Sequence, residues 1–129
     1  MAAAKALCHD SAVTSVLIVD DHPSFRASAR ALLEAEGFDV VGEAEDGAGA
    51  LQAAKELRPD VVLLDVQLPD TDGFDVAARL TRGAGNPPAV VLTSSRDGSD
   101  FGPLVKYSGA RGFVPKAELS AAVLATLLP

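Results

Sequence analysis

The chain has 129 residues, 48% of them hydrophobic, and its 18 acidic and 11 basic residues give a net charge of −7. This length fits one domain with a hydrophobic core and leaves no room for a second domain. The negative charge argues against nonspecific attraction to nucleic acid or anionic lipid. Because Cys8 is the only cysteine, neither an internal disulfide nor a cysteine-built zinc site is expected, which suits a reducing cytoplasm.

The first residues, MAAAKALCHDSAVTS, contain one lysine and a short hydrophobic patch that His9 and Asp10 interrupt. A secretory signal peptide has a longer hydrophobic region, and no stretch approaches the roughly 20 hydrophobic residues of a membrane span. We expect residues 1–14 to be a flexible leader and residues 15–129 to form the domain. By elimination the protein is expected in the cytoplasm, with no membrane partner.

A strand, a turn and a helix start are predicted after the leader. The hydrophobic run VLIV at 16–19 ends in Asp20 and Asp21, and Pro23 follows, which suits the first turn of a helix. Either Asp21 or Ser24 could be the N-cap of this helix. Hydrophobic residues with helical spacing precede a helix-ending Gly37, and they are Phe25, Ala29, Leu32 and Leu33.

The central strand is predicted at 61–64, where the run VVLL ends in Asp65 and the turn VQLPDTDG follows. A strand that is hydrophobic on both faces is typical of a parallel sheet covered by helices on both sides. Asp65 would therefore be a carboxylate that a buried strand delivers to a surface crevice.

The unit of strand and helix recurs along the whole chain. The other strands are predicted near 39–42 and at 89–93 and 112–114. Four more helices are predicted. The second helix of the chain carries Leu51, Ala54 and Leu57, the third spans about 74–80, the fourth begins near Pro103, and the last carries Leu119, Val123, Leu124 and Leu127. Five such units in strict alternation predict an α/β fold, with a doubly wound parallel sheet of five strands, right-handed crossovers and helices on both faces.

Polar side chains follow the predicted strands: Asp20 and Asp21 after the first, Asp65 after the third, Thr93 at the end of the fourth and Lys116 past the fifth. In a doubly wound sheet, ligands bind outside the carboxyl ends of the strands. Three carboxylates in one crevice repel one another, so the site should either raise a carboxyl pKa or bind a cation. Two aspartates and a phosphoryl group give Mg²⁺ the oxygen ligands that it prefers.

A carboxylate can act as a nucleophile and form an aspartyl phosphate. The charge that spreads over the transferred phosphoryl oxygens must then be neutralised by a metal and a nearby ammonium. Asp65 would be the acceptor because it is central, Lys116 would supply the ammonium, and the Thr93 hydroxyl would donate a hydrogen bond to the third oxygen.

With these motifs assembled, residues 15–128 resemble the receiver domain of two-component response regulators. The residues that carry the resemblance are the pair Asp20 and Asp21, Asp65 in LLDVQLPDTDG, Thr93 in VVLTS and Lys116 in GFVPK. The resemblance implies a flavodoxin-like sheet with strand order 2-1-3-4-5. It also implies phosphoryl transfer to Asp65 from a sensor histidine kinase or a phosphotransfer protein.

The resemblance further assigns roles to single residues. It implies Mg²⁺ bound by Asp21, Asp65 and the main-chain carbonyl of Gln67, with Asp20 acting through water. Gln67 and Ser95 occupy positions that tune the lifetime of the phosphoryl group, and Phe113 occupies the position of the switch residue. A downstream protein partner would bind the face formed by the fourth helix, the fifth strand and the last helix.

The sequence departs from the family pattern at two places. Lys116 is followed by Ala117 where many receivers have proline, so the usual cis bond is absent. Gly98, Gly102 and Pro103 interrupt the fourth helix, and an internal proline costs a helix about 3 kcal/mol. We therefore expect a short helix from about Pro103, an altered output face, and fast hydrogen exchange at residues 96–103.

Other polar residues are given simpler interpretations. His9 and His22 are expected to be solvated loop residues, although each could suggest phosphohistidine or metal chemistry. Asp70 and Asp72 are expected to shape the turn after the central strand, and Tyr107 to be a packing or surface residue.

Several function classes stay open. The sequence favours a stand-alone phosphorylatable switch that is not an enzyme and has no direct contact with nucleic acid. A receiver fragment of a DNA-binding regulator and a degenerate receiver that only binds a partner are the alternatives. A haloacid-dehalogenase-type phosphatase also uses an aspartyl nucleophile, but that family has a DxD motif after the first strand where this chain has DDH.

Overall fold

The structure is a computed structural model that describes residues 13–83, 85–95 and 101–128. Strands and helices alternate along these residues. In chain order the elements are β1 (Ser15–Val19), α2 (Pro23–Ala35), β2 (Asp39–Ala44), α3 (Gly47–Leu57), β3 (Val61–Asp65), α4 (Gly73–Thr81), β4 (Ala89–Ser94), α5 (Gly102–Ser108), β5 (Gly112–Pro115), the 3₁₀ helix η2 (Lys116–Glu118) and α6 (Ala121–Thr126).

The five strands form one sheet in the order β2-β1-β3-β4-β5, and every neighbouring pair is parallel. This confirms the predicted fold class and the strand order implied by the family resemblance. The order reverses direction at β1 and β3, so the loops after these two strands diverge and leave a crevice at their carboxyl ends.

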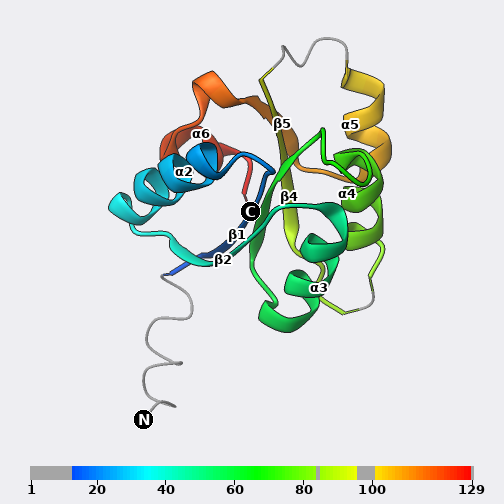
Figure 1. The fold of residues 1–129 in the computed structure, drawn as a ribbon, viewed down its shortest axis with the longest axis horizontal. Helices are drawn as coiled ribbons and strands as arrows, with labels where there is room; N and C mark the ends of the chain where they lie inside the picture. The colour runs from blue at the N-terminus through cyan, green and yellow to red at the C-terminus, as the bar shows by residue number, and fades with distance from the viewer. Residues whose placement is uncertain (1–12, 84, 96–100, 129) are drawn as a thin grey trace.

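Helices cover both faces of the sheet (Figure 1). α2 and α6 lie on one face, and α3, α4 and α5 lie on the other. The strand side chains divide accordingly into two hydrophobic clusters, one with α2 and α6 and one with α3 and α4. The core therefore consists of two layers separated by the sheet.

The burial of β3, the central strand, explains why its sequence is continuously hydrophobic. Val61 and Leu63 belong to the cluster under α2 and α6, whereas Val62 and Leu64 belong to the cluster under α3 and α4. All four side chains are buried. Because successive side chains point to opposite faces, a strand covered on both sides needs hydrophobic residues at every position.

The start of α2 differs from the prediction. Its N-cap is His22, and no side chain caps this helix, so the assignment of Asp21 or Ser24 is wrong. The Asp20 carboxylate instead accepts a hydrogen bond from the His22 amide at 2.8 Å, which directs the first turn toward the end of β1. Pro23 in the first turn has no amide hydrogen to satisfy. The helix ends where predicted, since Gly37 has a φ of 96°.

Asp70 and Asp72 do more than shape their turn, because each carboxylate also accepts hydrogen bonds from main-chain amides in the first turn of a helix. The Asp70 carboxylate accepts hydrogen bonds from the amides of Gly47 at 2.8 Å and Ala48 at 3.0 Å, at the start of α3. These two bonds lower the pKa of Asp70. Asp72 is the N-cap of α4 and accepts from the Asp75 amide at 2.8 Å. The turn after β3 is thereby fixed to both neighbouring helices.

Two hydrophobic residues of the predicted helices are partly exposed, and the predicted short helix is confirmed. Leu57 and Val123 are 43% and 37% exposed. α5 begins at Gly102, has Pro103 in its first turn and is seven residues long. Of the segment 96–103 for which fast exchange is expected, residues 96–100 lie outside the described residues.

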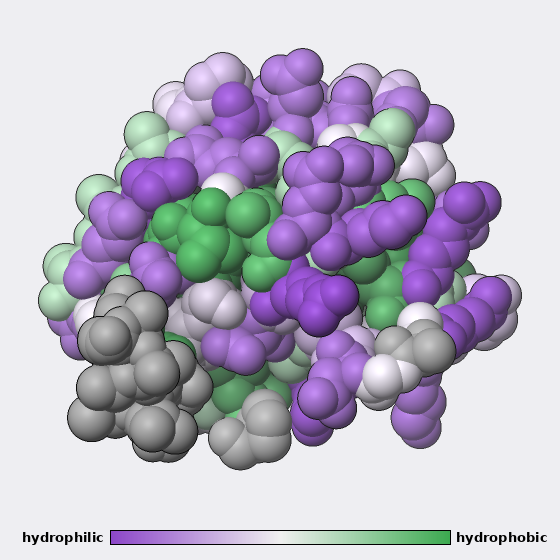
Figure 2. Space-filling model, turned by 90° about the horizontal axis from the view of Figure 1, so that it is seen from below, coloured by the Kyte–Doolittle hydropathy of each residue, from purple (hydrophilic) through white to green (hydrophobic). Residues whose placement is uncertain are grey.

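The amino-terminal edge of the sheet carries a cavity of about 800 Å³ between the ends of α3 and α4. Seen from below, this side of the molecule has hydrophobic patches surrounded by hydrophilic side chains (Figure 2). Among the cavity's lining residues, Lys55 and Arg79 lie in the last turns of α3 and α4. Basic residues at these places are explained by the negative ends of the helix dipoles.

None of the described helices combines the length and the apolar character that crossing a membrane requires.

Candidate functional site

Four polar side chains meet at the carboxyl edge of the sheet, where the sequence predicts a site. Asp20 follows β1, Asp65 ends β3, Thr93 lies in β4 and Lys116 follows β5. The sheet order makes β1, β3, β4 and β5 successive neighbours, and Asp65 pairs with Thr93 in register. Asp20, Asp65 and Thr93 are all buried. The fold therefore brings polar groups that are as far apart in sequence as Asp20 and Lys116 into one crevice.

Lys116 links the two buried carboxylates. Its Nζ lies 2.6 Å from Asp20 Oδ2 and 3.2 Å from Asp65 Oδ2, and its side chain is 15% exposed. Nζ also lies 4.6 Å from the centre of the Phe25 ring, a distance at which a cation and an aromatic face attract each other. Burial lowers the pKa of Lys116, but the pairing with Asp20 and Asp65 outweighs it, so the pKa is raised.

Asp65 is held in an environment that disfavours its charge. Burial is the largest cause, and the nearby charge of Asp20 adds to it, so the pKa of Asp65 is raised. The Gln67 amide, which donates to Asp65 Oδ1 at 3.1 Å, and the Lys116 ammonium act in the opposite direction. A cation placed beside Asp65 would relieve the remaining cost of the charge.

The chain after β1 completes an acidic cluster. Asp21 is 38% exposed, in contrast to the fully buried Asp20. Ligand atoms of Asp20, Asp21, His22 and Asp65 all lie within 4.8 Å of one another. Three carboxylates at this spacing fit the oxygen-rich coordination of Mg²⁺. The buried Thr93 Oγ1 has no hydrogen-bond partner among the described residues, which fits an additional oxygen ligand at the site.

The cavity beside this cluster has a volume of about 150 Å³. It is lined by residues from the four loops at this edge of the sheet, which are Asp21, His22, Asp65, Gln67, Leu68, Pro69, Ser95 and Lys116. Gln67 and Ser95 line the same cavity as Asp65.

Phe113 lies apart from this cavity. Its half-buried ring packs against Phe101 with 5.6 Å between the ring centres, and Phe101 in turn packs against Phe74 at 5.5 Å. The three rings tie β5, the start of α5 and α4 together. Phe113 therefore has a packing role in this structure, at a position between the site and the α5 face.

His22 and Arg26 are part of the site, but the sequence analysis did not find them. His22 is not simply solvated, because its Nδ1 lies 3.1 Å from Asp20 Oδ1 and 3.0 Å from Asp21 Oδ1. His22 is a loop residue with a side chain that is 65% exposed, as predicted, and it also contacts both members of the acidic pair. The sequence feature that could have indicated this contact is the position of His22 directly after Asp20 and Asp21, where a turn brings its side chain close to theirs.

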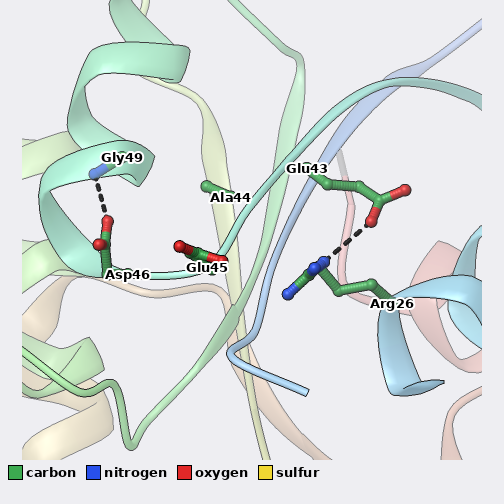
Figure 3. Close-up of a pocket in the computed structure, with 6 residues that line it drawn as sticks. All are labelled: Arg26, Glu43, Ala44, Glu45, Asp46 and Gly49. Atoms are coloured by element: carbon green, nitrogen blue, oxygen red, sulfur yellow. Dashed lines mark hydrogen bonds and ion pairs between the residues drawn. The ribbon is translucent and has the colours of Figure 1, made fainter. Parts of the chain in front are cut away.

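Arg26 supports the loop after β1 from behind. Its Nη1 donates to the main-chain carbonyl of Asp20 at 2.5 Å, and its Nε donates to Glu43 Oε1 at 2.9 Å. Figure 3 shows this hydrogen bond between Arg26 and Glu43, both of which line a cavity of about 350 Å³. Glu43 also pairs with Arg30, and these arginines lower its pKa. One turn of α2, the end of β2 and the acidic loop are thus joined by charged hydrogen bonds.

The family model for the response regulator receiver domain matches residues 16–127. The chain belongs to this family. A curated relative described as a transcriptional regulator, from Pseudomonas aeruginosa, is 45% identical over 106 residues, which are 82% of this chain and 51% of the relative. The DNA-binding response regulator MtrA of Mycolicibacterium smegmatis is 44% identical over 118 residues, 87% of this chain and 50% of MtrA.

Solved receiver structures have the same fold. The receiver domain of a NarL response regulator from Mycobacterium tuberculosis superposes with a TM-score of 0.76 and is 40% identical, over 88% of this chain and 95% of that chain. The receiver family interacts with histidine kinases or phosphotransfer proteins, binds Mg²⁺ at an acidic pocket and is generally not enzymatic.

One expectation is not supported by these relatives. The receiver chain spans about half the length of the curated relatives that it matches, and those relatives are regulators of transcription. The prediction that the protein does not contact nucleic acid is therefore not supported for a protein as long as these relatives. The negative charge describes this domain and says nothing of a DNA-binding part elsewhere.

Proposed function

We propose that this receiver accepts a phosphoryl group on Asp65 from a histidine kinase or a phosphotransfer protein, with Mg²⁺ bound beside it. The observation that carries the proposal is the geometry around Asp65. Its carboxylate is buried, has a raised pKa, contacts the Lys116 ammonium and lies within a cluster of three carboxylates. A buried carboxylate beside other carboxylates gains from a cation that balances its charge, and the same cation and the Lys116 ammonium can balance the charge of a phosphoryl group.

In the proposed reaction an oxygen of Asp65 attacks the phosphorus, and the bond from phosphorus to the donor nitrogen breaks. Asp65 is the nucleophile and becomes the acyl phosphate. Lys116 neutralises one of the phosphoryl oxygens, and the Thr93 hydroxyl, which has no other partner among the described side chains, donates to another. When bound, Mg²⁺ would neutralise the charge that the remaining oxygens share with the aspartates.

The chain's own residues supply the ligands of the ion in this proposal. Asp21 and Asp65 offer carboxylates and Gln67 its main-chain carbonyl, whereas Asp20 acts through water because Lys116 already pairs with its Oδ2. Gln67 and Ser95 line the cavity and would set how easily water reaches the acyl phosphate. Their side chains would therefore tune its lifetime.

Phosphorylation would act on the rest of the molecule through Lys116 and Thr93. The phosphoryl group adds about −1.5 to −2 charges, which draws the ammonium and the hydroxyl toward it. Thr93 lies in β4, and Lys116 directly follows β5, the strand that carries Phe113. Repacking of Phe113 would then change the face formed by α5, β5 and α6, where a downstream protein would bind.

For the whole protein, the relatives favour a transcriptional regulator whose receiver is residues 15–129, preceded by the leader at 1–14. Two curated relatives of about twice the length of the match carry names of this kind. The stand-alone regulator is the second candidate, and a degenerate receiver that only binds a partner is the third.

The experiment that tests the proposal is the intact mass after incubation with a small acyl phosphate such as acetyl phosphate. We expect a gain of one phosphoryl group in the presence of Mg²⁺, and no gain without Mg²⁺ or in Asp65→Asn. Full modification of Asp65→Asn would move the acceptor elsewhere. If neither acetyl phosphate nor a panel of histidine kinases modifies the wild-type chain, the degenerate binding module is the better description.

A further inference from the structure

His22 lies inside the acidic cluster, and the proposed function gives it no role. Its Nδ1 lies within 3.1 Å of one carboxylate oxygen of Asp20 and one of Asp21. With Asp65 these residues offer four ligand atoms within 4.8 Å of one another. Three of the four donors are carboxylate oxygens, and the fourth is an imidazole nitrogen.

The main chain fixes His22 at this place. Its amide donates to Asp20 Oδ1 at 2.8 Å, and its carbonyl accepts from the Arg26 amide at 3.1 Å. As the N-cap of α2, immediately before Pro23, it has an extended backbone with φ −102° and ψ 108°. The side chain is 65% exposed, so the ring borders the cavity from the solvent side without filling the buried crevice.

The spacing of the donors suits adjacent positions around one ion. Oxygen and nitrogen ligands lie about 2.1 Å from Mg²⁺ or from a divalent transition metal, so adjacent ligands of an octahedron are about 3.0 Å apart. The Nδ1 of His22 lies 3.0 Å from Asp21 Oδ1. Asp21 is the exposed carboxylate of the cluster, and the proposed function already makes it an ion ligand.

We propose that His22 is a further ligand of the divalent ion, so that this site binds transition metal ions through imidazole nitrogen as well as carboxylate oxygen. Mg²⁺ prefers oxygen ligands and keeps its waters, so it gains little from His22. Ni²⁺ and its neighbours in the first transition row gain more, because imidazole suits them. The inference rests on the metal site of the proposed function and concerns which ions that site selects.

The direct test is the electron spin echo of Mn²⁺ bound to the full chain, because it detects a nitrogen bonded to the ion. We expect a nitrogen coupling in the wild-type protein and in His9→Ala, which removes the other histidine, and no such coupling in His22→Gln. Absence of the coupling in the wild type, or its persistence in His22→Gln, would overturn the inference.

Affinity supplies a second readout. By calorimetry, His22→Gln should weaken Ni²⁺ binding at least roughly tenfold, since even outer-shell partners of metal sites contribute that much, and should weaken Mg²⁺ binding less. His9→Ala controls for binding of Ni²⁺ at the leader, where Cys8 and His9 are adjacent. Equal losses for both ions would show that His22 only shapes the acidic loop, and the inference would fail.

The wild-type protein separates this inference from the proposed function. If Mg²⁺ binds and supports phosphorylation by acetyl phosphate while Mn²⁺ shows no nitrogen coupling, only the role of His22 fails. If the wild-type chain binds neither Mg²⁺ nor Mn²⁺, the metal site of the proposed function fails together with the inference.

Discussion

β3, the strand that carries Asp65, and α5, a helix of the proposed output face, differ in how deeply they are buried. All five residues of β3 are buried, and the strand pairs with β1 on one side and β4 on the other. α5 has seven residues, of which Ser108 alone is buried. An isolated helix of this length is unstable in water, so α5 depends on its few tertiary contacts.

Within α5, Val105 packs against the hydrophobic cluster under α3 and α4, and further contacts lie at the two ends of the helix. At its start, Phe101 packs between Phe74 and Phe113. At its end, the Thr81 hydroxyl donates to the Ser108 carbonyl at 3.0 Å. Between them, Tyr107 is 69% exposed. The proposed chemistry therefore lies on a fully buried strand, whereas the proposed output face includes a short and largely exposed helix, which we expect to open locally at a lower free energy.

The largest expected difference is between two leucines, one in each region. Leu63→Ala should lower the free energy of unfolding by about 3 kcal/mol, since it leaves a cavity in a fully buried strand. Leu104→Ala, at a side chain that is 45% exposed, should change it by less than about 0.5 kcal/mol. Urea denaturation of both variants measures the difference. Similar losses would mean that α5 is as firmly packed as β3.

Removal of the Lys116 charge should have a comparable effect on the rigid region. Lys116→Met leaves Asp20 and Asp65 buried without their cation, and loss of one partner of a buried pair costs about 3 kcal/mol. Denaturant midpoints at neutral pH measure the loss. The double variant Asp20→Asn with Lys116→Met serves as the control and should recover part of the lost stability. If it recovers none, the loss in Lys116→Met does not come from the broken ion pair.

A smaller loss is expected behind the acidic loop. Arg26→Met removes the hydrogen bonds to the Asp20 carbonyl and to Glu43, and should cost about 1 to 2 kcal/mol. Arg30→Met is the matched control, because Arg30 also pairs with Glu43 but is more exposed and does not contact the loop after β1. We expect Mg²⁺ affinity to fall in Arg26→Met and to stay closer to wild type in Arg30→Met, as measured by calorimetry.

The smallest expected effect has the opposite sign and depends on pH. The pKa of Asp65 is raised in the folded protein, chiefly by burial, so the folded state binds this proton more tightly than the unfolded state does. Stability from this group is therefore present below the unfolded pKa and is lost as the pH rises through the folded pKa.

Asp65→Asn removes that cost and should be more stable than the wild type at neutral pH in the absence of divalent ions. The advantage should shrink as the pH falls toward the unfolded pKa of an aspartate. Melting temperatures of both proteins from pH 7 down to pH 4 measure it. An advantage that is constant with pH would have to come from something other than the Asp65 charge.

The sequence was informative wherever a local pattern repeats. Continuous hydrophobic runs ended at the positions where β1, β3 and β4 end, because a strand buried on both faces leaves no place for a polar residue until it reaches the edge. Pro103 marked the start of α5 for an equally local reason, since proline fits only the first turn of a helix.

The sequence left open the surroundings of residues that depend on distant parts of the chain. Leu57 has the helical spacing of a hydrophobic face, but its side chain is 43% exposed. Asp70 lies in a turn-forming sequence, and its carboxylate also accepts hydrogen bonds from the first amides of α3, more than twenty residues earlier. Periodicity shows which face of a helix is hydrophobic and gives no information on where the covering surface ends.

By itself the sequence determined the alternation of strands and helices and the placement of Asp20, Asp65, Thr93 and Lys116 at strand ends, because backbone geometry brings the carboxyl ends of parallel strands to one edge. Only the tertiary structure decided which groups touch there. The pairing of Lys116 with both carboxylates, the approach of His22 to Asp20 and Asp21, and the support from Arg26 and Glu43 are side-chain contacts. Such contacts depend on how packed elements orient each side chain, which no spacing along the chain specifies.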